Sequence, residues 1–354
     1  MTDLGKVDRA FFDEYIYPNL GADRDDVAIG PTHGVDFGLL EIGDRAVSIA
    51  TDPVSLLPGL GFDRAGRFAL DFVLADVAVS GLAPSHLAIS FTLPPEMTDE
   101  EFAAVWRSMH EEAEDLGVSV VTGHTARYAG CEFPWVGGAT ALGVGDPSDV
   151  VRPDGARVGD DVLVTKGPAV EATGLLTNLF PDQFDLPPET LEAARSRLDD
   201  AECVRDAMTA SAAGEVHAMH DATECGVFGA LNEVADGAGV RFDVSLEEIP
   251  VRPGVRETCE YLGIDPWAAT TGGTLVIAVD PEDTDAVVSA LESEGTPVGV
   301  AEGTSAARQT TSVGVAGRVS EGSGVYADGE RIEHPDVDPS WAAYDELSRR
   351  AENE

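Results

Sequence analysis

The chain has 354 residues, of which 65 are acidic and 22 basic, so its net charge is −43 and its pI is about 4.2. This charge excludes a general nucleic-acid binder, because phosphate contacts need clustered Lys and Arg side chains. The acidic residues are spread along the whole chain. We therefore expect a surface adapted to a high-salt cytoplasm rather than an acidic tail for a basic partner.

The length exceeds the ~250–300 residues at which a single core stops growing, so we expect two domains. A polar stretch with Pro and Gly at residues 146–159 suggests domains at residues 1–148 and 149–335, followed by a polar tail or helix at 336–354. No run approaches the ~20 apolar residues of a membrane span, and no secretory signal is visible. The four scattered cysteines fit reduced thiols, so we expect a cytoplasmic protein with no membrane contact.

Apolar periodicity predicts the elements of the first half. In chain order they are a helix at 6–17, strands at 35–42 and 46–50, a helix from Arg67, a strand at 87–91, a helix at 99–116, and strands at 118–121 and 135–144. The helix that begins near Arg67 is apolar on nearly all sides, and such a helix is a buried one.

The second half alternates in the same way. In chain order it has a strand at 161–165, helices at 168–180 and 201–213 with another between them, a strand at 216–220, a helix at 227–236, a strand at 274–279, a helix at 283–293, a strand at 297–301, and a closing strand and short helix. Since both halves mix strands and helices, the predicted fold class is α/β, with two α+β sandwich domains.

Asp71 and Asp76 are the only charged residues of the apolar helix after Arg67. They lie five residues apart, so they leave the helix in different directions. Asp76 shares a stripe with Ala69 and Phe72, where a carboxylate is costly unless something compensates it. We therefore predict that Asp76 contacts a metal or ligand; the alternative is a helix cap or a salt-bridged core aspartate.

Carboxylates on a turn, a strand end and a helix predict a Mg²⁺–nucleotide site, because Mg²⁺ prefers oxygen ligands and bridges phosphates. The candidate carboxylates are Asp25, Asp26, Asp52 and Asp76. Gly123, Gly272 and Gly273 would let backbone N–H groups approach the phosphates. The GxxxxGK[ST] and GxGxxG motifs are absent.

Several residues keep two interpretations. His124 is a ligand or base, or a neutral histidine hydrogen-bonded at a strand end. Cys225 is an activated thiolate or, as we favour, a small residue tolerated at a helix start. Lys166 meets a phosphate or caps a strand, and His217 and His220 are predicted to be structural.

The order of the turns resembles the AIR synthetase (PurM-like) superfamily over roughly residues 20–320. The succession is Asp25-Asp26-Val27-Ala28, Thr51-Asp52-Pro53, the segment 75–84, Val121-Thr122-Gly123-His124-Thr125, and His220-Asp221-Ala222-Thr223-Glu224-Cys225-Gly226. The phrases at residues 221–235 and 262–266 are most similar to the AIR synthase-related branch with the hydrogenase-maturation HypE proteins. Together with the acidic composition, the resemblance suggests a halophilic archaeon as source.

The resemblance implies an N-terminal domain that forms a shared β-barrel with its copy in a homodimer, and a C-terminal α/β domain. The apolar helix, which cannot face water, favours the dimer too. ATP and Mg²⁺ would bind between domains and subunits, with Mg²⁺ on Asp25, Asp26, Asp52 and Asp76, and with Asp76 and His124 catalytic. The residues expected to bind the nucleotide are Gly123, Thr125, Arg127, Asp221, Thr223, Glu224, Gly226, Gly272 and Gly273.

The chain departs from the family pattern at several positions. Arg24 replaces a Gly before the double acid, and Ala75 replaces an Asn. Residues 123–126, Gly-His-Thr-Ala, stand where HypE has Gly-Asp-Thr-Lys, so Arg127 would have to supply the charge. Residues 271–273, Thr-Gly-Gly, stand where HypE has Asn-Glu-Gly. A C-terminal cysteine like that of HypE is absent, which argues against thiocarbamate dehydration by that route.

Two functions remain open. The first is an ATP- and Mg²⁺-dependent enzyme that phosphorylates or activates an oxygen of a small-molecule or protein acceptor, with thiamine-monophosphate kinase as a specific alternative. The second is a nucleotide-binding maturation or regulatory protein with little turnover.

Overall fold

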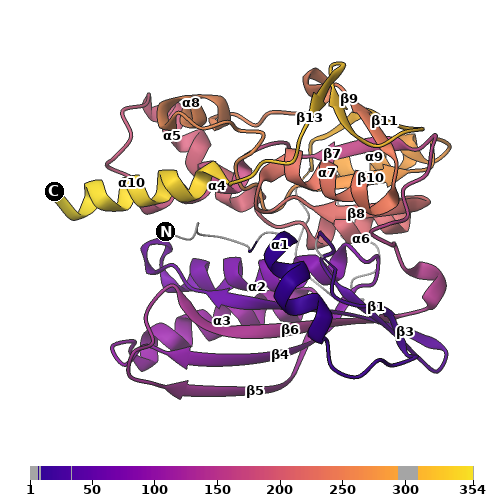
Figure 1. Cartoon of the computed structure of the whole chain (residues 1–354). Helices are drawn as coiled ribbons and strands as arrows, with labels where there is room; N and C mark the ends of the chain where they lie inside the picture. The colour runs from indigo at the N-terminus through magenta and orange to yellow at the C-terminus, as the bar shows by residue number, and fades with distance from the viewer. Residues whose placement is uncertain (1–6, 8, 33, 294–309, 354) are drawn as a thin grey trace.

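The computed structural model describes residues 7, 9–32, 34–293 and 310–353, and it places two β-sheets one above the other (Figure 1). The first sheet draws on residues 27–145 and the second on residues 161–332. Strand pairs are antiparallel except β4–β5 and β12–β9 within the described residues. Helices pack on these sheets, which confirms the predicted α+β sandwich architecture.

The first sheet has the strand order β1-β2-β3-β6-β4-β5. Its strands are β1 (Val27–Ile29), β2 (Gly38–Ile42), β3 (Arg45–Ser55), β4 (Pro84–Leu93), β5 (Ser119–Arg127) and β6 (Trp135–Gly145). The helices α2 (Phe62–Ala78) and α3 (Asp99–Asp115) pack against each other, and α2 packs on β3 and β6. The helix α3 connects the parallel strands β4 and β5, as a crossover connection must.

Local sequence signals explain where α3 begins and ends. The Thr98 hydroxyl accepts a hydrogen bond from the Glu101 N–H at 3.2 Å, and the Glu101 carboxylate accepts one from the Thr98 N–H at 2.7 Å. This capping box satisfies two of the four free N–H groups of the first turn. Gly117 follows the helix with a φ of 75°, a conformation that suits glycine.

The second sheet has the strand order β13-β12-β9-β11-β7-β10-β8. Its strands are β7 (Asp161–Thr165), β8 (Val216–Asp221), β9 (Arg241–Val244), β10 (Leu275–Val279), β11 (Val313–Ser320), β12 (Gly324–Ala327) and β13 (Glu330–Ile332). Its helices are α4 (Val170–Leu179), α5 (Pro188–Arg195), α6 (Val204–Ala213), α7 (Gly226–Ala238), α8 (Val255–Leu262), α9 (Thr284–Glu292) and α10 (Pro339–Asn353). Short helical segments complete the described chain: α1 (Arg9–Phe11), η1 (Phe12–Ile16), η2 (Tyr17–Asn19), η3 (Pro58–Leu60), η4 (Pro147–Asp149), η5 (Ser196–Asp200) and η6 (Leu246–Glu248).

Three expectations differ from the structure. Residues 123–125 lie inside β5 and not in a turn after it, because this edge strand is exposed along nearly its whole length and carries no alternating pattern. The elements β9 and α8 are not predicted, and α10 is longer than the short closing helix expected. The strand predicted at 297–301 lies outside the described residues.

One hydrophobic core joins the two sheets through α2. Leu70 and Val73 of α2 belong to the same cluster of buried side chains as Leu163 and Ile277 of the second sheet. The opposite face of the second sheet packs on α7 in a separate cluster. Other parts of the same chain therefore cover the apolar helix. The expectation that its hydrophobicity favours a dimer was wrong.

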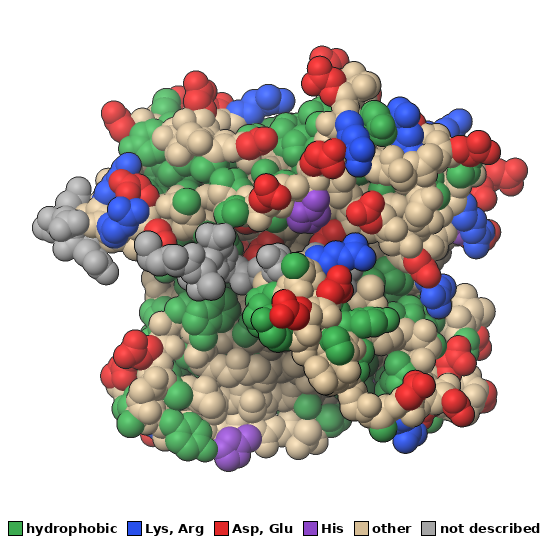
Figure 2. Space-filling view, in the orientation of Figure 1, with side chains coloured by type: hydrophobic (Ala, Val, Ile, Leu, Met, Phe, Trp, Pro, Cys, Tyr) green, Lys and Arg blue, Asp and Glu red, His purple; other side chains and the backbone are tan. Residues whose placement is uncertain are grey.

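The surface matches the acidic composition. Asp and Glu side chains are dispersed over the face in Figure 2, with fewer Lys and Arg between them. Dispersed charge of one sign keeps the molecule hydrated and is screened by salt. Among the described residues, none of the helices combines the length and the hydrophobicity needed to cross a membrane.

A buried network of charges crosses from α2 and α3 to α6. Glu112 of α3 forms an ion pair with Arg205 at 2.5 Å and another with Arg67 at 3.1 Å. Asp71 lies beside it, 3.8 Å from Arg67. Burial and the negative charges of Glu112 and Glu202 raise the pKa of Asp71 well above its ordinary value, against the opposing effect of Arg67 and Arg205. Arg205 therefore supplies the positive charge that this interior requires.

We expect Arg205→Met to lower the free energy of unfolding by about 3–5 kcal/mol, because it leaves the Glu112 carboxylate buried without its closest cation. The matched control is Arg152→Met, which breaks the half-exposed pair with Asp154 and should cost about 0–1 kcal/mol. Urea denaturation of the unmodified protein and the two variants measures both losses in the free energy of unfolding. Equal stability losses in the two variants would contradict a structural role for the network.

Candidate functional site

The turn at residues 221–226 joins β8 to α7 and forms the first part of the site. Asp221 closes β8 and is only 2% exposed, whereas Thr223, Glu224 and Cys225 are half-buried. Cys225 and Gly226 both have positive φ angles, 65° and 60°. A Cβ at Gly226 would lie 2.5 Å from the Ala269 carbonyl oxygen, so glycine is needed for this close approach. The start of α7 is thereby fixed against residues 267–269.

The segment Thr271-Gly272-Gly273 lies next to this turn and is buried. Glu171, in the first turn of α4, accepts hydrogen bonds from the Thr270 hydroxyl at 2.8 Å and from the Gly272 N–H at 2.9 Å. A Cβ at Gly272 would lie 2.9 Å from the Glu171 carboxylate and 2.5 Å from the Phe72 ring. Glu171 and Phe72 thus fill the space that opens over Gly272. The Gly272 N–H, which was predicted to approach a phosphate, already donates its hydrogen bond to Glu171.

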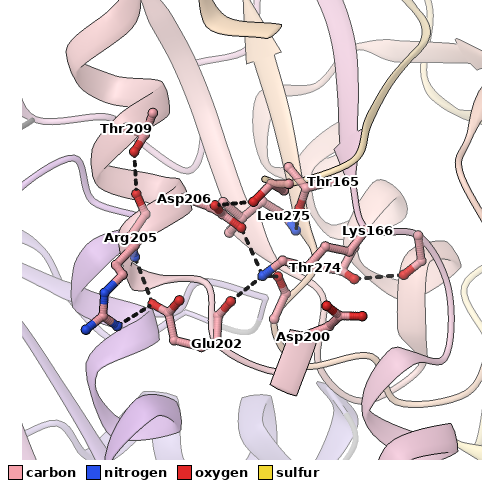
Figure 3. A network of polar contacts seen from close by, with 12 residues as sticks. Thr165, Lys166, Asp200, Glu202, Arg205, Asp206, Thr209, Thr274 and Leu275 are labelled. Atoms are coloured by element: carbon pink, nitrogen blue, oxygen red, sulfur yellow. Dashed lines mark hydrogen bonds and ion pairs between the residues drawn. The ribbon is translucent and has the colours of Figure 1, made fainter. Parts of the chain in front are cut away.

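A buried lysine, Lys166, anchors the next residue, Gly273, through its main-chain carbonyl. Figure 3 shows Lys166 together with its partner Asp206. The Lys166 ammonium donates to the Gly273 carbonyl at 3.2 Å and to the Glu202 carbonyl, and it pairs with Asp206 at 2.9 Å. Burial lowers the pKa of Lys166, but the charges of Asp206 and Glu202 raise it above its ordinary value. Of the two interpretations of Lys166, the structure favours the structural one, because its ammonium holds the glycine turn.

The first domain reaches this turn through α2. Phe72 packs against Gly272, and Asp76 lies one helical turn beyond Phe72 on the same stripe. Asp52 lies on the face of β3 that carries Ala50 and Val54, which belong to the core shared with α2. Asp52 and Asp76 are both half-buried. Asp76 therefore lies on the stripe of α2 that faces the second domain, and Asp52 lies on the strand face that packs on α2.

The acidic turn at Asp25 and Asp26 is less suited to a preformed metal site. Asp26 pairs with Arg24 at 2.5 Å, and these hydrogen bonds lower the pKa of Asp26, while Asp25 is exposed. In the part of the chain that is described, no three carboxylates from Asp25, Asp26, Asp52 and Asp76 bring ligand oxygens within 4.8 Å of one another. The structure does not gather the four predicted ligands into one cage.

The segment at residues 123–127 lies on the outer edge of the first sheet, away from the second domain (Figure 1). A Cβ at Gly123 would collide with the Ile89 carbonyl, so this glycine allows the close pairing of β4 and β5. His124 and Thr125 are exposed, and the His124 ring lies 3.2 Å from the Tyr128 hydroxyl. Arg127 donates to the Met97 carbonyl and pairs with Asp99 at 2.8 Å. Within one chain these residues are not brought to the glycine turn.

Two carboxylates of the site are missing from the sequence prediction. Asp338 accepts from the Ser340 N–H at 2.7 Å as the cap of α10, and from the Cys225 N–H at 2.9 Å at the start of α7. Ser340 in turn accepts from the Thr270 N–H at 3.1 Å. Glu171 could have been found by the argument used for Asp76, since it is a lone carboxylate in an apolar helix start. Asp338 has no such signal, because its position depends on a contact across 113 residues.

Burial gives Glu171 unusual acid–base properties. Burial raises the pKa of Glu171 to about 7, the hydrogen bonds from Thr270 and Gly272 oppose this rise, and the charges of Asp338 and Glu224 add to it. A carboxyl group that is half-protonated near neutral pH can act as a general acid or base. Four parts of the chain distant in sequence converge on the segment 270–273: residues 72, 171, 221–226 and 338–340.

The sequence and the fold correspond to a known family. Residues 34–146 match the family described as AIR synthase related protein, N-terminal domain, and residues 157–313 match AIR synthase related protein, C-terminal domain. The chain belongs to the AIR synthase related family, within the PurM-like superfamily, and lies on its HypE-like branch. This confirms the family predicted from the order of the turns.

The relatives include hydrogenase-maturation proteins. The chain is 30% identical over 261 residues to carbamoyl dehydratase HypE of Escherichia coli, covering 72% of this chain and 74% of that protein. The crystal structure of that protein superimposes with a TM-score of 0.68 at 26% identity, over 83% of this chain and 87% of the other. A putative hydrogenase expression/formation protein of Methanocaldococcus jannaschii is 25% identical over 289 residues, 81% of this chain and 84% of that protein. A HypE structure in complex with ATP shares the fold, with a TM-score of 0.64 at 23% identity over 94% of this chain and 93% of the other.

The raised pKa of Glu171 predicts a pH-dependent stability. Since the folded protein holds this proton more tightly than the unfolded chain, the contribution is fully present below pH 4.5 and is lost as the pH rises through about 7. We expect the free energy of unfolding to fall by up to about 1.4 kcal/mol per pH unit between pH 5 and 7 from this group. Glu171→Gln should flatten that slope, and the exposed control Glu189→Gln should retain it. Identical slopes in all three proteins, measured by denaturation at each pH, would show that Glu171 titrates normally.

Proposed function

We propose that this protein is an ATP- and Mg²⁺-dependent enzyme that phosphorylates or activates an oxygen of a small-molecule or protein acceptor. The observation that carries the proposal is the contact of Phe72 with Gly272, because it sets the stripe of α2 that carries Asp76 against the carboxylates and the helix start of the second domain. The fold shared with a HypE that binds ATP supports the nucleotide as ligand.

The residue types fit Mg²⁺ even though no cage is preformed. Asp76 supplies a carboxylate on the stripe of α2 that faces the second domain, and Asp52 supplies one from the face of β3 that packs on α2. Mg²⁺ commonly takes one or two carboxylates, several waters and substrate phosphates. We assign Asp52 and Asp76 as its principal ligands, with Asp25 and Asp26 as further candidates. A bound Mg²⁺ would neutralise charge on the phosphates, while the chain positions them.

The second domain would hold the acceptor and control its proton. Thr223, Glu224 and Asp221 lie where a short turn leads into α7, and helix starts favour anionic groups. Glu171 adds a carboxyl group with a pKa near 7 beside Gly272 and Gly273. We propose that Glu171 serves as the general acid or base of the site, and that the turn at 221–226 orients the acceptor.

A nucleotide-binding protein with little turnover is the second candidate, and one observation favours it. The Gly272 N–H is already accepted by Glu171, and Asp338 already occupies the start of α7. The Gly272 and Cys225 N–H groups would both have to exchange partners before they could bind a phosphate. An ATPase assay in molar KCl, with and without a panel of metabolites, separates the two candidates.

We propose the outer edge of the first sheet as the interface of a homodimer. The segment with Gly123, His124, Thr125 and Arg127 lies on β5, an edge strand whose exposed apolar side chains include Val120 and Val121. Exposed strand edges are ready to pair with another chain. We propose that two chains associate at this edge, and that residues 123–127 contribute to the nucleotide site from the dimer interface.

The Mg²⁺ assignment predicts a specific loss in Asp76→Asn. This variant keeps the shape of the side chain and removes its charge, so the affinity for Mg²⁺-ATP should fall tenfold or more, about 1.4 kcal/mol. The control is Asp63→Asn, an exposed carboxylate in the first turn of the same helix, which should bind as the unmodified protein does. Calorimetric titration with thermal melts measures affinity and stability together. Unchanged affinity with reduced stability would assign Asp76 to the core and not to the site.

The dimer proposal predicts that Val121→Glu separates the chains. Light scattering in high salt should report about twice the 37.1 kDa chain mass for the unmodified protein and a single chain mass for the variant, because a buried carboxylate at the interface is costly. Val121 and Val158 are 55% and 56% exposed, so Val158→Glu is a matched control away from β5 that should remain dimeric. A monodisperse monomer of the unmodified protein would refute the proposal.

A further inference from the structure

Behind the turn at residues 221–226 lies a second group of metal-capable side chains. His220 and Asp221 are the last two residues of β8, and Asp36 reaches them from the loop between β1 and β2. The ligand atoms of these three residues lie within 4.8 Å of one another. His220 and Asp221 are buried, and the Asp36 side chain is 9% exposed. The group thus joins the first domain to the second in a dry environment.

The distance between His220 and Asp36 suits an ion shared by these two side chains. His220 Nδ1 lies 3.4 Å from the Asp36 carboxylate. Two ligand atoms that each lie about 2.1 Å from a tetrahedral ion are about 3.4 Å apart. The other ring nitrogen, Nε2, lies 3.2 Å from the Glu233 carboxylate of α7. A carboxylate behind a ligating imidazole commonly fixes its tautomer and orientation, so Glu233 occupies the supporting position.

An unsatisfied atom points to a missing ligand. Asp221 Oδ1 is fully buried and has no hydrogen-bond partner among the described residues. Leaving a buried carboxylate oxygen without a partner is costly, so this site lacks one positive or donating group. Asp221 is also within reach of His220 and Asp36, which makes a shared cation the group that would satisfy it.

The charge balance leads to the same conclusion. Three carboxylates, Asp36, Asp221 and Glu233, surround one buried imidazole. Within the described part of the chain, the ion pairs of these carboxylates add one further basic group, the half-exposed His334 at 3.7 Å from Glu233. A protonated His220 would supply one charge against three. A divalent ion in place of the Nδ1 proton supplies two, and it leaves the Nε2 proton for Glu233 to accept.

We propose that Asp36, His220 and Asp221 bind a divalent first-row transition-metal ion, with Glu233 as the positioning residue behind His220. An imidazole nitrogen selects such ions over Mg²⁺, which prefers oxygen ligands only. The ion would fasten the loop before β2 to the end of β8, beside the turn assigned to the acceptor. The site shares Asp221 with the turn assigned to the acceptor, but metal binding does not require ATP, so it can be tested separately from the proposed function.

The competing interpretation is a salt-bridged histidine. Burial lowers the pKa of His220, but the charges of Asp36, Glu233 and Asp221 raise it to about 10. An imidazolium at Nδ1 would donate to the Asp221 carbonyl at 2.6 Å and hold the carboxylates without metal. That arrangement predicts no stoichiometric metal binding, so the two interpretations are separable.

The test uses Co²⁺ as the probe, with tag-free full-length protein that has been treated with a chelator and freed of nucleotide. We expect one equivalent of Co²⁺ to bind and to give visible absorption bands of a low-coordinate nitrogen–oxygen site, with millimolar Mg²⁺ unable to displace it. Asp221→Asn and His220→Gln should each weaken Co²⁺ binding tenfold or more. A thermal melt of each variant establishes that it is folded, and Asp36→Asn replaces any variant that is not.

The matched control is His217→Gln on the same strand. His217 belongs to another group with metal-capable side chains, Glu215 and Asp280, but its ring nitrogens lie 2.9 Å from Asp160 and 2.7 Å from the Arg157 guanidinium. This variant should bind Co²⁺ as the unmodified protein does. Absence of Co²⁺ binding, or binding that survives both Asp221→Asn and His220→Gln, would overturn the proposal. Loss of ATP binding with Co²⁺ binding intact would reject the proposed function alone.

Discussion

The burial of α2 between the first sheet and the second domain is the constraint on which the rest of this structure depends. The helix packs on β3, β6 and α3 on one side and on α6 on the other, so its side chains belong to one core that spans both sheets. A helix enclosed in this way must be apolar nearly all round, and each charge on it needs compensation. Asp71 obtains it from Arg67 and Arg205, whereas Asp76 is directed toward the domain interface.

The site depends on this docking because its parts come from both domains. Phe72 closes over Gly272, and the Glu171 carboxylate takes the Gly272 N–H, so the space at a glycine is filled by side chains that lie 200 and 101 residues away. The shape of the turn at Gly272 therefore depends on side chains from both domains.

An acidic protein has few cations to place inside, and their locations show where the interior needs them. Lys166 is one of two lysines in the chain, and it is buried between Asp206 and the carbonyls of Glu202 and Gly273 (Figure 3). Arg205 is buried against Glu112 at the contact between the domains. At His220 the carboxylates outnumber the cation, and there a metal ion becomes the simplest counter-charge.

Most of the helices and strands, and the family, could be predicted from the sequence, whereas β9 and α8 could not. Periodicity locates the buried helix and separates the directions of Asp71 and Asp76, because three or four residues make one helical turn. It fails at Gly123 and His124, since an edge strand exposed on both faces has no alternation to read. Only the tertiary structure decided which carboxylates meet. The Asp338 contact with Cys225 and the Asp36 contact with His220 join residues more than a hundred positions apart, and such pairings depend on how the sheets and helices pack, which no local pattern encodes.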